Sequence, residues 1–216
     1  MTNDSGNKID AIIFIDGNNF YHNVKNMRIK PSRIDFKKLS EVVCSNFNVN
    51  WSRTRYYNSI PNVEDDKEIY WKHINFLEEL GKLPKFDIIT RKIQRSSSKE
   101  LLAEKRGIIA NLGLCKNCKP LVETNCYDCI GSVKLREKGI DVKIAVDMVE
   151  FAVKDKCNCI ILVSGDADFI PALKLVEENK KSVCSAFLRA GYAYELRNNF
   201  KFLIIGNNFI MEKCLK

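Results

Sequence analysis

The feature that most constrains the fold is a repeated alternation of short, continuous apolar runs with amphipathic segments. The longest apolar runs cover residues 11–15, 159–163 and 202–205. Runs of this length are typical of strands buried on both faces, and their alternation with helical patterns predicts a parallel, doubly wound α/β sheet. Each is far shorter than the roughly 18 apolar residues that a membrane-spanning helix needs.

The same pattern gives approximate bounds for the elements. We expect strands at 9–15, 54–60, 86–93, 159–163, 182–188 and 201–205, and helices at 20–27, 35–47, 65–80, 141–153, 168–179 and 192–198. A turn is expected at 16–19 and a polar loop at 95–99. Because sites in such folds lie at the carboxyl ends of the strands, the residues that follow each strand are the first candidates for function.

Positive charge is concentrated in the middle of the chain. The net charge is +8, and the segment from Lys82 to Lys143 holds fourteen basic against seven acidic residues. Such a surface favours polyanions, although a merely solvated lysine-rich surface would look the same. Our candidates for contact with nucleic acid are Asn18, Arg91, Lys92, Arg95, Lys99, Lys105, Arg106, Lys134, Arg136 and Lys138.

Two Cys-x-x-Cys pairs stand out among the nine cysteines. Cys115, Cys118, Cys126 and Cys129 provide four thiolates, the ligand set of a structural zinc, and free or redox-active thiols are the alternative. We expect this knuckle within an inserted basic segment, 96–131, and we expect the other five cysteines to be buried. The first ten residues are polar and have no signal-peptide core, so we expect a cytoplasmic protein.

Carboxylates follow the apolar runs in three places. Asp16 ends the first expected strand, Asp166 and Asp168 follow the strand at 159–163, and Asp141 begins a helix that also carries Asp147. Clustered carboxylates repel one another unless a cation compensates them, and oxygen ligands suit Mg²⁺ or Mn²⁺. Such an ion could activate a water for attack on phosphorus. Asp141 and Asp168 would equally suit helix caps, and Asp147 does not share a helical face with Asp141.

Three motifs then carry a resemblance to a known family. In chain order they are Phe14-Ile15-Asp16-Gly17-Asn18-Asn19, Lys138-Gly139-Ile140-Asp141-Val142 with Ala145-Val146-Asp147-Met148, and Leu162-Val163-Ser164-Gly165-Asp166-Ala167-Asp168-Phe169-Ile170-Pro171. Together they resemble the NYN domain family, and more narrowly its LabA-like branch, within the PIN-like nuclease superfamily.

The resemblance implies a fold and a chemistry. The fold is a PIN-like three-layer α/β/α sandwich with a mostly parallel central sheet and a small zinc-binding insertion, forming one domain over residues 1–216. The chemistry is that of a Mg²⁺- or Mn²⁺-dependent ribonuclease. The acidic positions of the family map onto Asp16, Asp141, Asp166 and Asp168, and Asp147, which matches a recurrent acid of the helix motif, is a further expected ligand of the Mg²⁺ or Mn²⁺. The segment at 96–131 departs from the compact family pattern.

Three functions follow as hypotheses. The first is a metal-dependent ribonuclease acting on single-stranded or structured RNA. The second is a non-catalytic RNA-binding regulatory adaptor with the same fold. The third is a phosphatase with an aspartyl nucleophile, which usually has a second acid two residues on, where this chain has Asn18. A homodimer is a further expectation, for which no particular residue gives evidence.

Overall fold

The computed structural model describes residues 8–61, 63, 66–92, 94–95, 98–125, 135–136 and 139–216. These residues form two compact units. The larger one combines residues up to Arg91 with Gly139–Lys216, and the smaller one spans Lys92–Lys138. The expected insertion at 96–131 falls within the smaller unit.

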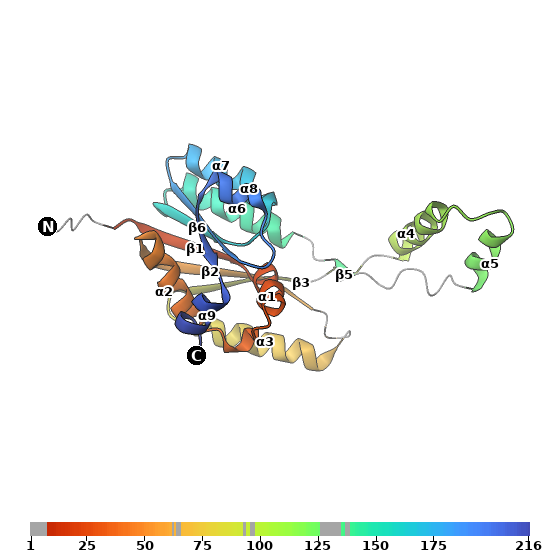
Figure 1. Ribbon diagram of the computed structural model, residues 1–216, viewed down its shortest axis with the longest axis horizontal. Coiled ribbons are helices and arrows are strands. Elements are labelled where there is room, and N and C mark those ends of the chain that lie inside the picture. The colour runs from red at the N-terminus through yellow and green to blue at the C-terminus, as the bar shows by residue number, and fades with distance from the viewer. Residues whose placement is uncertain are drawn as a thin grey trace. The chain divides into compact units, whose positions relative to one another are not determined.

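A six-stranded sheet forms the centre of the larger unit, with the order β3-β2-β1-β6-β7-β8 (Figure 1). β1 lies between β2 and β6 and pairs in parallel with both, and β7 pairs in parallel with β6 and β8. The carboxyl ends of β1 and β6 therefore lie side by side. The strands are β1 (Asp10–Asp16), β2 (Asn50–Ile60), β3 (Phe86–Lys92), β6 (Cys159–Val163), β7 (Ser182–Leu188) and β8 (Lys201–Ile205).

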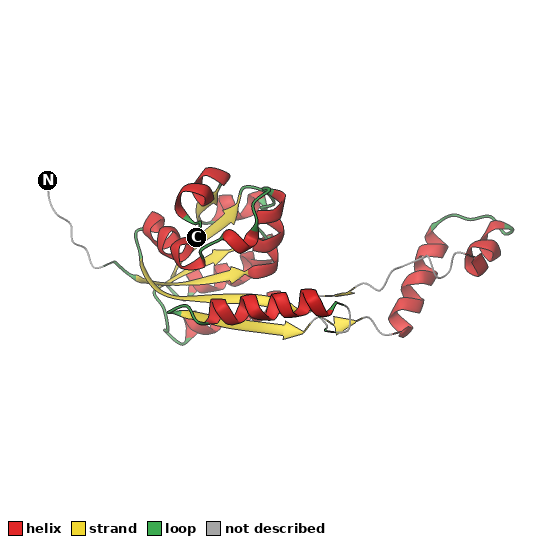
Figure 2. Ribbon diagram, turned by 90° about the horizontal axis from the view of Figure 1, so that it is seen from below, coloured by secondary structure: helices red, strands yellow, loops and turns green. Residues whose placement is uncertain are grey.

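Helices cover both faces of this sheet and complete three layers (Figures 1 and 2). One apolar cluster joins the sheet to α1 (Gly17–Asn26), α2 (Phe36–Phe47), α3 (Lys67–Gly81) and α9 (Asn207–Lys213). The other joins the opposite face to α6 (Ile140–Val153), α7 (Ile170–Glu178) and α8 (Tyr194–Asn199). Two short 3₁₀ turns, η1 (Pro31–Arg33) and η2 (Ala167–Phe169), complete the elements of this unit.

The period-2 alternation of β2 shows how one strand serves both layers. Tyr56 belongs to the cluster under α2 and α3, whereas Tyr57 belongs to the cluster under α6. Both side chains are buried. A strand that is apolar on two faces can only be central, which explains why the sequence pattern identified a parallel sheet.

The α/β class predicted from the sequence is confirmed, and most element bounds agree to within a few residues. Two expectations were wrong, and one helix of the larger unit was missed. Residues 16–19 are not a separate turn, because α1 starts directly at Gly17. The polar segment at 95–99 is not wholly a loop, since a helix begins at Ser98. The helix α9 was not anticipated, because its seven residues are too few to show a period.

The smaller unit contains two helices and a short antiparallel ladder. α4 spans Ser98–Asn111 and α5 spans Cys118–Asn125. β4 (Gln94–Arg95) pairs with β5 (Leu135–Arg136). No helix in the described part of either unit is both long and apolar enough to span a bilayer.

Candidate active site

Asp16 lies at the carboxyl end of the central strand β1, where α1 begins. One carboxylate oxygen, Oδ1, accepts a hydrogen bond of 3.1 Å from the backbone N–H of Asn19 and so caps α1. The other, Oδ2, accepts a hydrogen bond of 3.1 Å from Ser164 Oγ, at the end of β6. The residue is only 4% exposed. These two bonds fix the carboxylate at the junction of both strands.

The electrostatic environment of Asp16 is unfavourable for a carboxylate. Burial, with smaller contributions from the negative charges of Asp141 and Asp166, raises its pKa from 3.8 to about 6, although the bonds from Asn19 and Ser164 oppose the shift. The neighbouring charges that raise its pKa have the same sign as its own. A buried anion in this setting is stabilised by a bound cation or by a proton.

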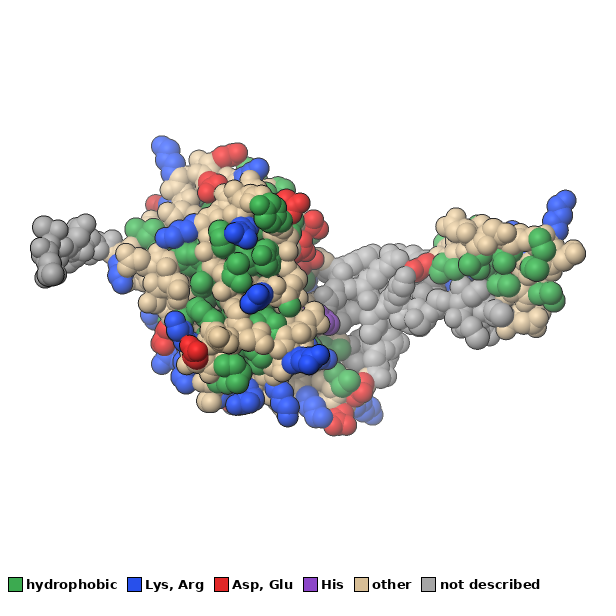
Figure 3. All heavy atoms as spheres, viewed as in Figure 1, with side chains coloured by type: hydrophobic (Ala, Val, Ile, Leu, Met, Phe, Trp, Pro, Cys, Tyr) green, Lys and Arg blue, Asp and Glu red, His purple; other side chains and the backbone are tan. Residues whose placement is uncertain are grey.

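Asp141 and Asp166, from two other segments, lie near Asp16, and Asp168 lies near Asp141. Asp141 is in the first turn of α6, and burial followed by the charges of Asp166 and Asp168 raises its pKa. Asp166 caps the 3₁₀ turn η2 by accepting a hydrogen bond of 2.9 Å from the backbone N–H of Asp168. The structure thus brings these four predicted site residues together at one sheet edge, where Figure 3 shows several acidic side chains gathered.

The loops that carry these acids are held in close contact. Asn19 Oδ1 accepts hydrogen bonds from the backbone N–H of Gly165 (3.1 Å) and from Asn23 Nδ2 (2.9 Å), and Asn23 Nδ2 also donates to the carbonyl of Gly191 (3.3 Å). A Cβ added to Gly165 would lie 2.1 Å from Gly191 O. Only glycine permits this approach of the two loops. Sequence reasoning overlooked the roles of Ser164, Asn19 and Asn23, because each depends on contacts between distant segments.

Asp147 lies in a different cluster of charges. It is 2% exposed, and its carboxylate accepts hydrogen bonds from Lys143 Nζ (2.6 Å), Tyr57 Oη (2.8 Å) and Arg55 Nη2 (2.9 Å). Burial alone would raise its pKa, but these three donors outweigh burial and lower it. Arg55 also contacts Asp87, at 3.4 Å, and its guanidinium lies over the ring of Phe151. The structure therefore gives Asp147 an anchoring position between α6 and β2, and does not group it with the other acids.

The predicted basic residues divide by location. Arg91 is near the acids, because a Cβ added to Gly139, two residues before Asp141, would lie 3.4 Å from Arg91 Nη1. Asn18 is the second residue of α1, beside Asp16. Lys92 ends β3, and Lys105 and Arg106 are on α4 of the smaller unit. For Arg95, Lys99 and Arg136 only the backbone is described, and Lys134 and Lys138 lie outside the described residues.

Tyr56 and Tyr57 are core residues, so their rings are not available to stack on bases. Tyr56 packs against Phe36 and Phe76 and lies so close to α1 that a Cβ on Gly17 would be 2.6 Å from its ring. Tyr192 is half-buried and stacks on Phe187. Trp71, on α3, is exposed.

The acids suit a hydrated divalent cation better than a fully protein-ligated one. Their donors are all carboxylate oxygens, which Mg²⁺ and Mn²⁺ prefer. Within the described residues, however, no three Asp, Glu, His or Cys side chains lie close enough together to enclose an ion. Because Mg²⁺ usually binds through one or two carboxylates and keeps several waters, this looser arrangement of carboxylates is compatible with it.

The predicted zinc knuckle is only half described. Cys115 and Cys118 are exposed free thiols at the start of α5, joined by a turn in which Cys118 N–H donates to Cys115 O (3.1 Å). Hydrogen bonds from Cys118, followed by one from Asn117, lower the pKa of Cys115, which favours the thiolate. Cys126 and Cys129 lie outside the described residues. The prediction that Cys44, Cys157, Cys159, Cys184 and Cys214 are buried is confirmed.

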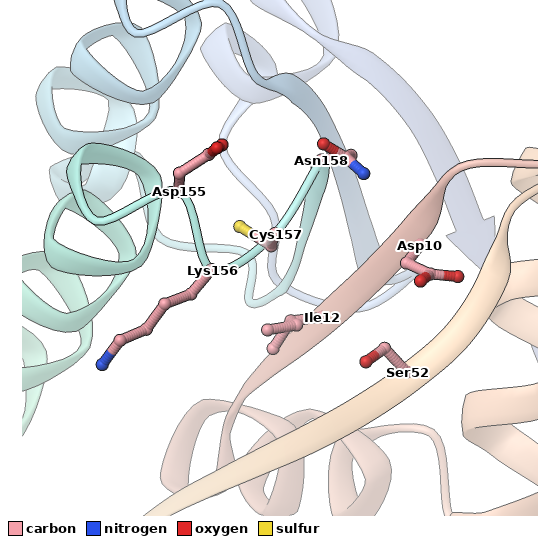
Figure 4. A pocket seen from close by; sticks show the side chains of 7 residues that line it. All are labelled: Asp10, Ile12, Ser52, Asp155, Lys156, Cys157 and Asn158. Carbon is pink, nitrogen blue, oxygen red and sulfur yellow. The ribbon is translucent and has the colours of Figure 1, made fainter.

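A separate hollow of about 260 Å³ lies at the opposite, amino end of the strands (Figure 4). Asp10 and Ile12 of β1 line it together with Asp155 and Cys157, which precede β6. Asp155 is paired with Lys181. Asp16 lies at the carboxyl ends of the strands, far from this hollow. The acidic residues of the hollow can therefore serve as control positions for substitutions in the site.

Comparisons with known proteins agree with this architecture. Residues 10–206 match the model of the NYN domain family. The chain is 31% identical over 81 residues to the uncharacterized protein MJ0482 of Methanocaldococcus jannaschii, a match that covers 37% of this chain and 34% of that protein. The chain therefore spans about a third of that relative's length.

A solved structure supports the fold. The crystal structure of a protein of unknown function, VPA0982 from Vibrio parahaemolyticus, superposes with a TM-score of 0.57 at 18% identity, with both chains covered in full. At this identity the likeness concerns the fold alone. With nearly all of the chain matched by the family model, we conclude that this protein belongs to the NYN domain family, a family of PIN-like nucleases.

Proposed function

We propose that this protein is a metal-dependent ribonuclease whose centre is the carboxylate cluster of Asp16, Asp141, Asp166 and Asp168. The observation that carries the proposal is the state of Asp16, a buried carboxylate whose pKa is raised to about 6 by burial and by acids of the same sign. Such strained electrostatics cost folding stability, and functional sites are where they are most often found. Membership in a family of PIN-like nucleases supports the same reading.

In this proposal each acid has a defined position. Asp16 and Asp166 provide the carboxylates closest to the ends of β1 and β6, and Asp141 and Asp168 complete the negative field around them. A bound Mg²⁺ or Mn²⁺ would polarise a phosphoryl oxygen and lower the pKa of a water. Ser164 and the N–H of Asn19 hold the Asp16 carboxylate in one orientation.

The surrounding residues would place the substrate. Arg91 lies beside the start of α6 and can contact a phosphate next to the acids. Asp16 and Asp141 lie at the N-termini of α1 and α6, whose partial positive charges also favour a phosphate there. Binding and orienting the phosphodiester is the main work of a protein in phosphoryl transfer.

Two finer assignments belong to the same proposal. We assign the chain to the LabA-like branch of its family on the strength of the three sequence motifs. The four cysteines of the 115–129 segment hold a structural zinc, which is supported by the turn that joins Cys115 to Cys118 and by the lowered pKa of Cys115. Zinc there would stabilise a segment that has few apolar residues of its own.

The experiment that tests the function is cleavage of a mixed pool of end-labelled single-stranded and hairpin RNA. We expect wild-type protein to cut in Mn²⁺ or Mg²⁺ and not in EDTA, and Asp16→Asn to bind RNA without cutting it. Asp155→Asn, at the opposite sheet edge, is the matched control and should cut normally. If wild-type protein binds RNA but leaves it intact in every metal, the adaptor function replaces the nuclease.

A further inference from the structure

Exposed aromatic side chains are unevenly distributed over the larger unit. Within the described residues, four Phe, Tyr or Trp side chains are more than a third exposed: Tyr21 (44%), Trp71 (56%), Tyr194 (64%) and Phe202 (38%). Three of them, all except Phe202, are among the first five residues of a helix that follows the carboxyl end of a strand. The carboxyl ends of these strands lie on one side of the sheet, and Asp16 is on that same side.

Backbone and side-chain hydrogen bonds tie two of these aromatics to the acids. Tyr21 lies two residues after Asn19, whose side chain accepts from Gly165 and whose N–H donates to Asp16. Tyr194 follows Ala193, whose N–H donates to Gly165 O at 2.8 Å, and Gly165 precedes Asp166. The backbone next to both residues is therefore anchored to the loops that carry the carboxylates.

Trp71 reaches the same edge along α3. This helix follows β2 and begins near its carboxyl end, where Figures 1 and 2 show its first turn. Trp71 is the fifth residue of α3, as Tyr21 is of α1, so each lies about 6 Å along its helix. Leu77 and Leu80, in the second half of α3, are the buried residues of this helix, and Phe76 packs on Tyr56 beside Gly17. The first half of α3 thus extends beyond the core.

A positive charge lies over the ring of Tyr21, and other cations are near Trp71 and Tyr194 in sequence, on α3 and α8. Lys25 Nζ lies 5.4 Å from the ring centre of Tyr21. Lys67 and Lys72 are exposed on the same two turns as Trp71, with Lys72 paired to Glu68, and Arg197, one turn after Tyr194, lies over the ring of Phe202 at 5.3 Å. Flat aromatic faces next to cations are what proteins use to bind unpaired nucleic acid, because every base has a face that can stack.

We propose that Tyr21, Trp71 and Tyr194 form a stacking surface for an unpaired RNA strand, which holds bases on both sides of the phosphate at Asp16. The inference rests on the proposed function and specifies its substrate as single-stranded. A protein partner fits less well, because the rings come from three separate helices with charged residues between them, and a protein interface has an apolar centre. The acidic cluster repels phosphates and so weakens RNA binding. Stacking of the bases on the three rings compensates for that loss of affinity.

The test uses Trp71 as its own reporter. In the full-length Asp16→Asn Trp51→Phe protein, Trp71 is the only tryptophan, and EDTA together with Asp16→Asn prevents cleavage. We expect a single-stranded 12-nucleotide RNA to quench Trp71 emission saturably and the matching 12-base-pair duplex to quench it far less. Trp71→Ala and Tyr194→Ala, measured by fluorescence anisotropy of labelled RNA, should each weaken single-strand binding by about 5- to 100-fold.

Phe202→Leu is the matched control, since Phe202 is also an exposed aromatic, with the cation of Arg197 over its ring, but lies on the edge strand β8. Equal RNA affinity for Trp71→Ala and Phe202→Leu, or binding without quenching, would overturn the stacking surface while leaving a nuclease intact. Conversely, RNA can quench Trp71 emission, and the Ala substitutions can weaken RNA binding, in a protein that never cuts RNA. The stacking surface and the nuclease function therefore fail separately. A blue shift that grows with protein concentration in the absence of RNA would instead identify a surface for self-association and also contradict the proposal.

Discussion

Arg55 Nη2 lies 2.9 Å from Asp147 Oδ2, and this ion pair connects the central layer to α6. It is the centre of a network in which Tyr57 and Lys143 also donate to Asp147, while Arg53 and Arg55 share Asp87. Because Asp141 lies in the first turn of α6, the network also fixes the helix that presents one of the site acids. Asp147 therefore affects the site by holding α6, and with it Asp141, in position.

Asp147→Asn is expected to destabilise the fold without removing the metal site. The variant loses the buried charge that accepts from Arg55 and Lys143, while Arg55 keeps its contact with Asp87, so urea unfolding should show a loss of about 1.5–3 kcal/mol. Lys143→Met, whose partner keeps Arg55 and Tyr57, should cost less than about 1 kcal/mol. Mn²⁺ should still stabilise Asp147→Asn. Loss of that stabilisation with an unchanged unfolding free energy would return Asp147 to the metal ligands.

Asp16→Asn is expected to stabilise the metal-free fold above pH 6. The pKa of Asp16 is about 6 in the fold against 3.8 ordinarily, so between these values the folded chain holds a proton that the unfolded chain has released. Stability should then fall as pH rises from about 4 to 6, by about 3 kcal/mol in all. The Asp16→Asn variant avoids this loss, because its amide does not ionise. Urea unfolding in EDTA at pH 4 and pH 7.5 measures the unfolding free energies of both proteins. If Asp16→Asn is more stable than wild type by the same amount at both pH values, the ionisation of Asp16 does not cause the stabilisation.

The sheet, its helices and the grouping of four acids were predictable from the sequence because each depends on local patterns. The apolar runs identify strands, and a parallel sheet brings the carboxyl ends of neighbouring strands together, so Asp16 and Asp166 had to meet. The position of Asp147 was not predictable. Its partners Arg55 and Tyr57 lie about 90 residues away in sequence, and neither has a local signal. The same is true of the loop contacts made by Asn19 and Asn23.

Gly165→Ala should reduce both stability and activity. Its Cβ would lie 2.1 Å from Gly191 O, so the loops of Asp166 and Tyr192 must separate. We expect a loss of about 1–3 kcal/mol in unfolding free energy, together with slower cleavage under conditions where the variant is fully folded. Gly81→Ala is the control, because its Cβ would meet Ile88 at 3.4 Å. If Gly165→Ala is as stable and active as Gly81→Ala, the close approach of the loops is not required.

The cysteine segment should contain one zinc per chain. Elemental analysis of purified protein is expected to show one equivalent of zinc, which Cys115→Ser with Cys118→Ser removes. Cys157→Ala, a buried cysteine of the larger unit, should retain the metal. The larger unit should still unfold cooperatively without zinc, since its core does not involve these thiols. Wild-type protein without zinc, with all four thiols titrating freely, would contradict the site.

The most direct test of the central claim is the single-turnover rate of RNA cleavage in Mn²⁺ from pH 5 to pH 8. Wild-type protein and Asp155→Asn should cut at equal rates that rise with pH, because protons compete with Mn²⁺ for the Asp16 carboxylate, whose pKa is raised in the metal-free fold. Asp16→Asn with Asp166→Asn should cut at least about 100-fold more slowly. Cleavage by the double variant at the wild-type rate, or cleavage that persists in EDTA, would show that these carboxylates do not carry the reaction.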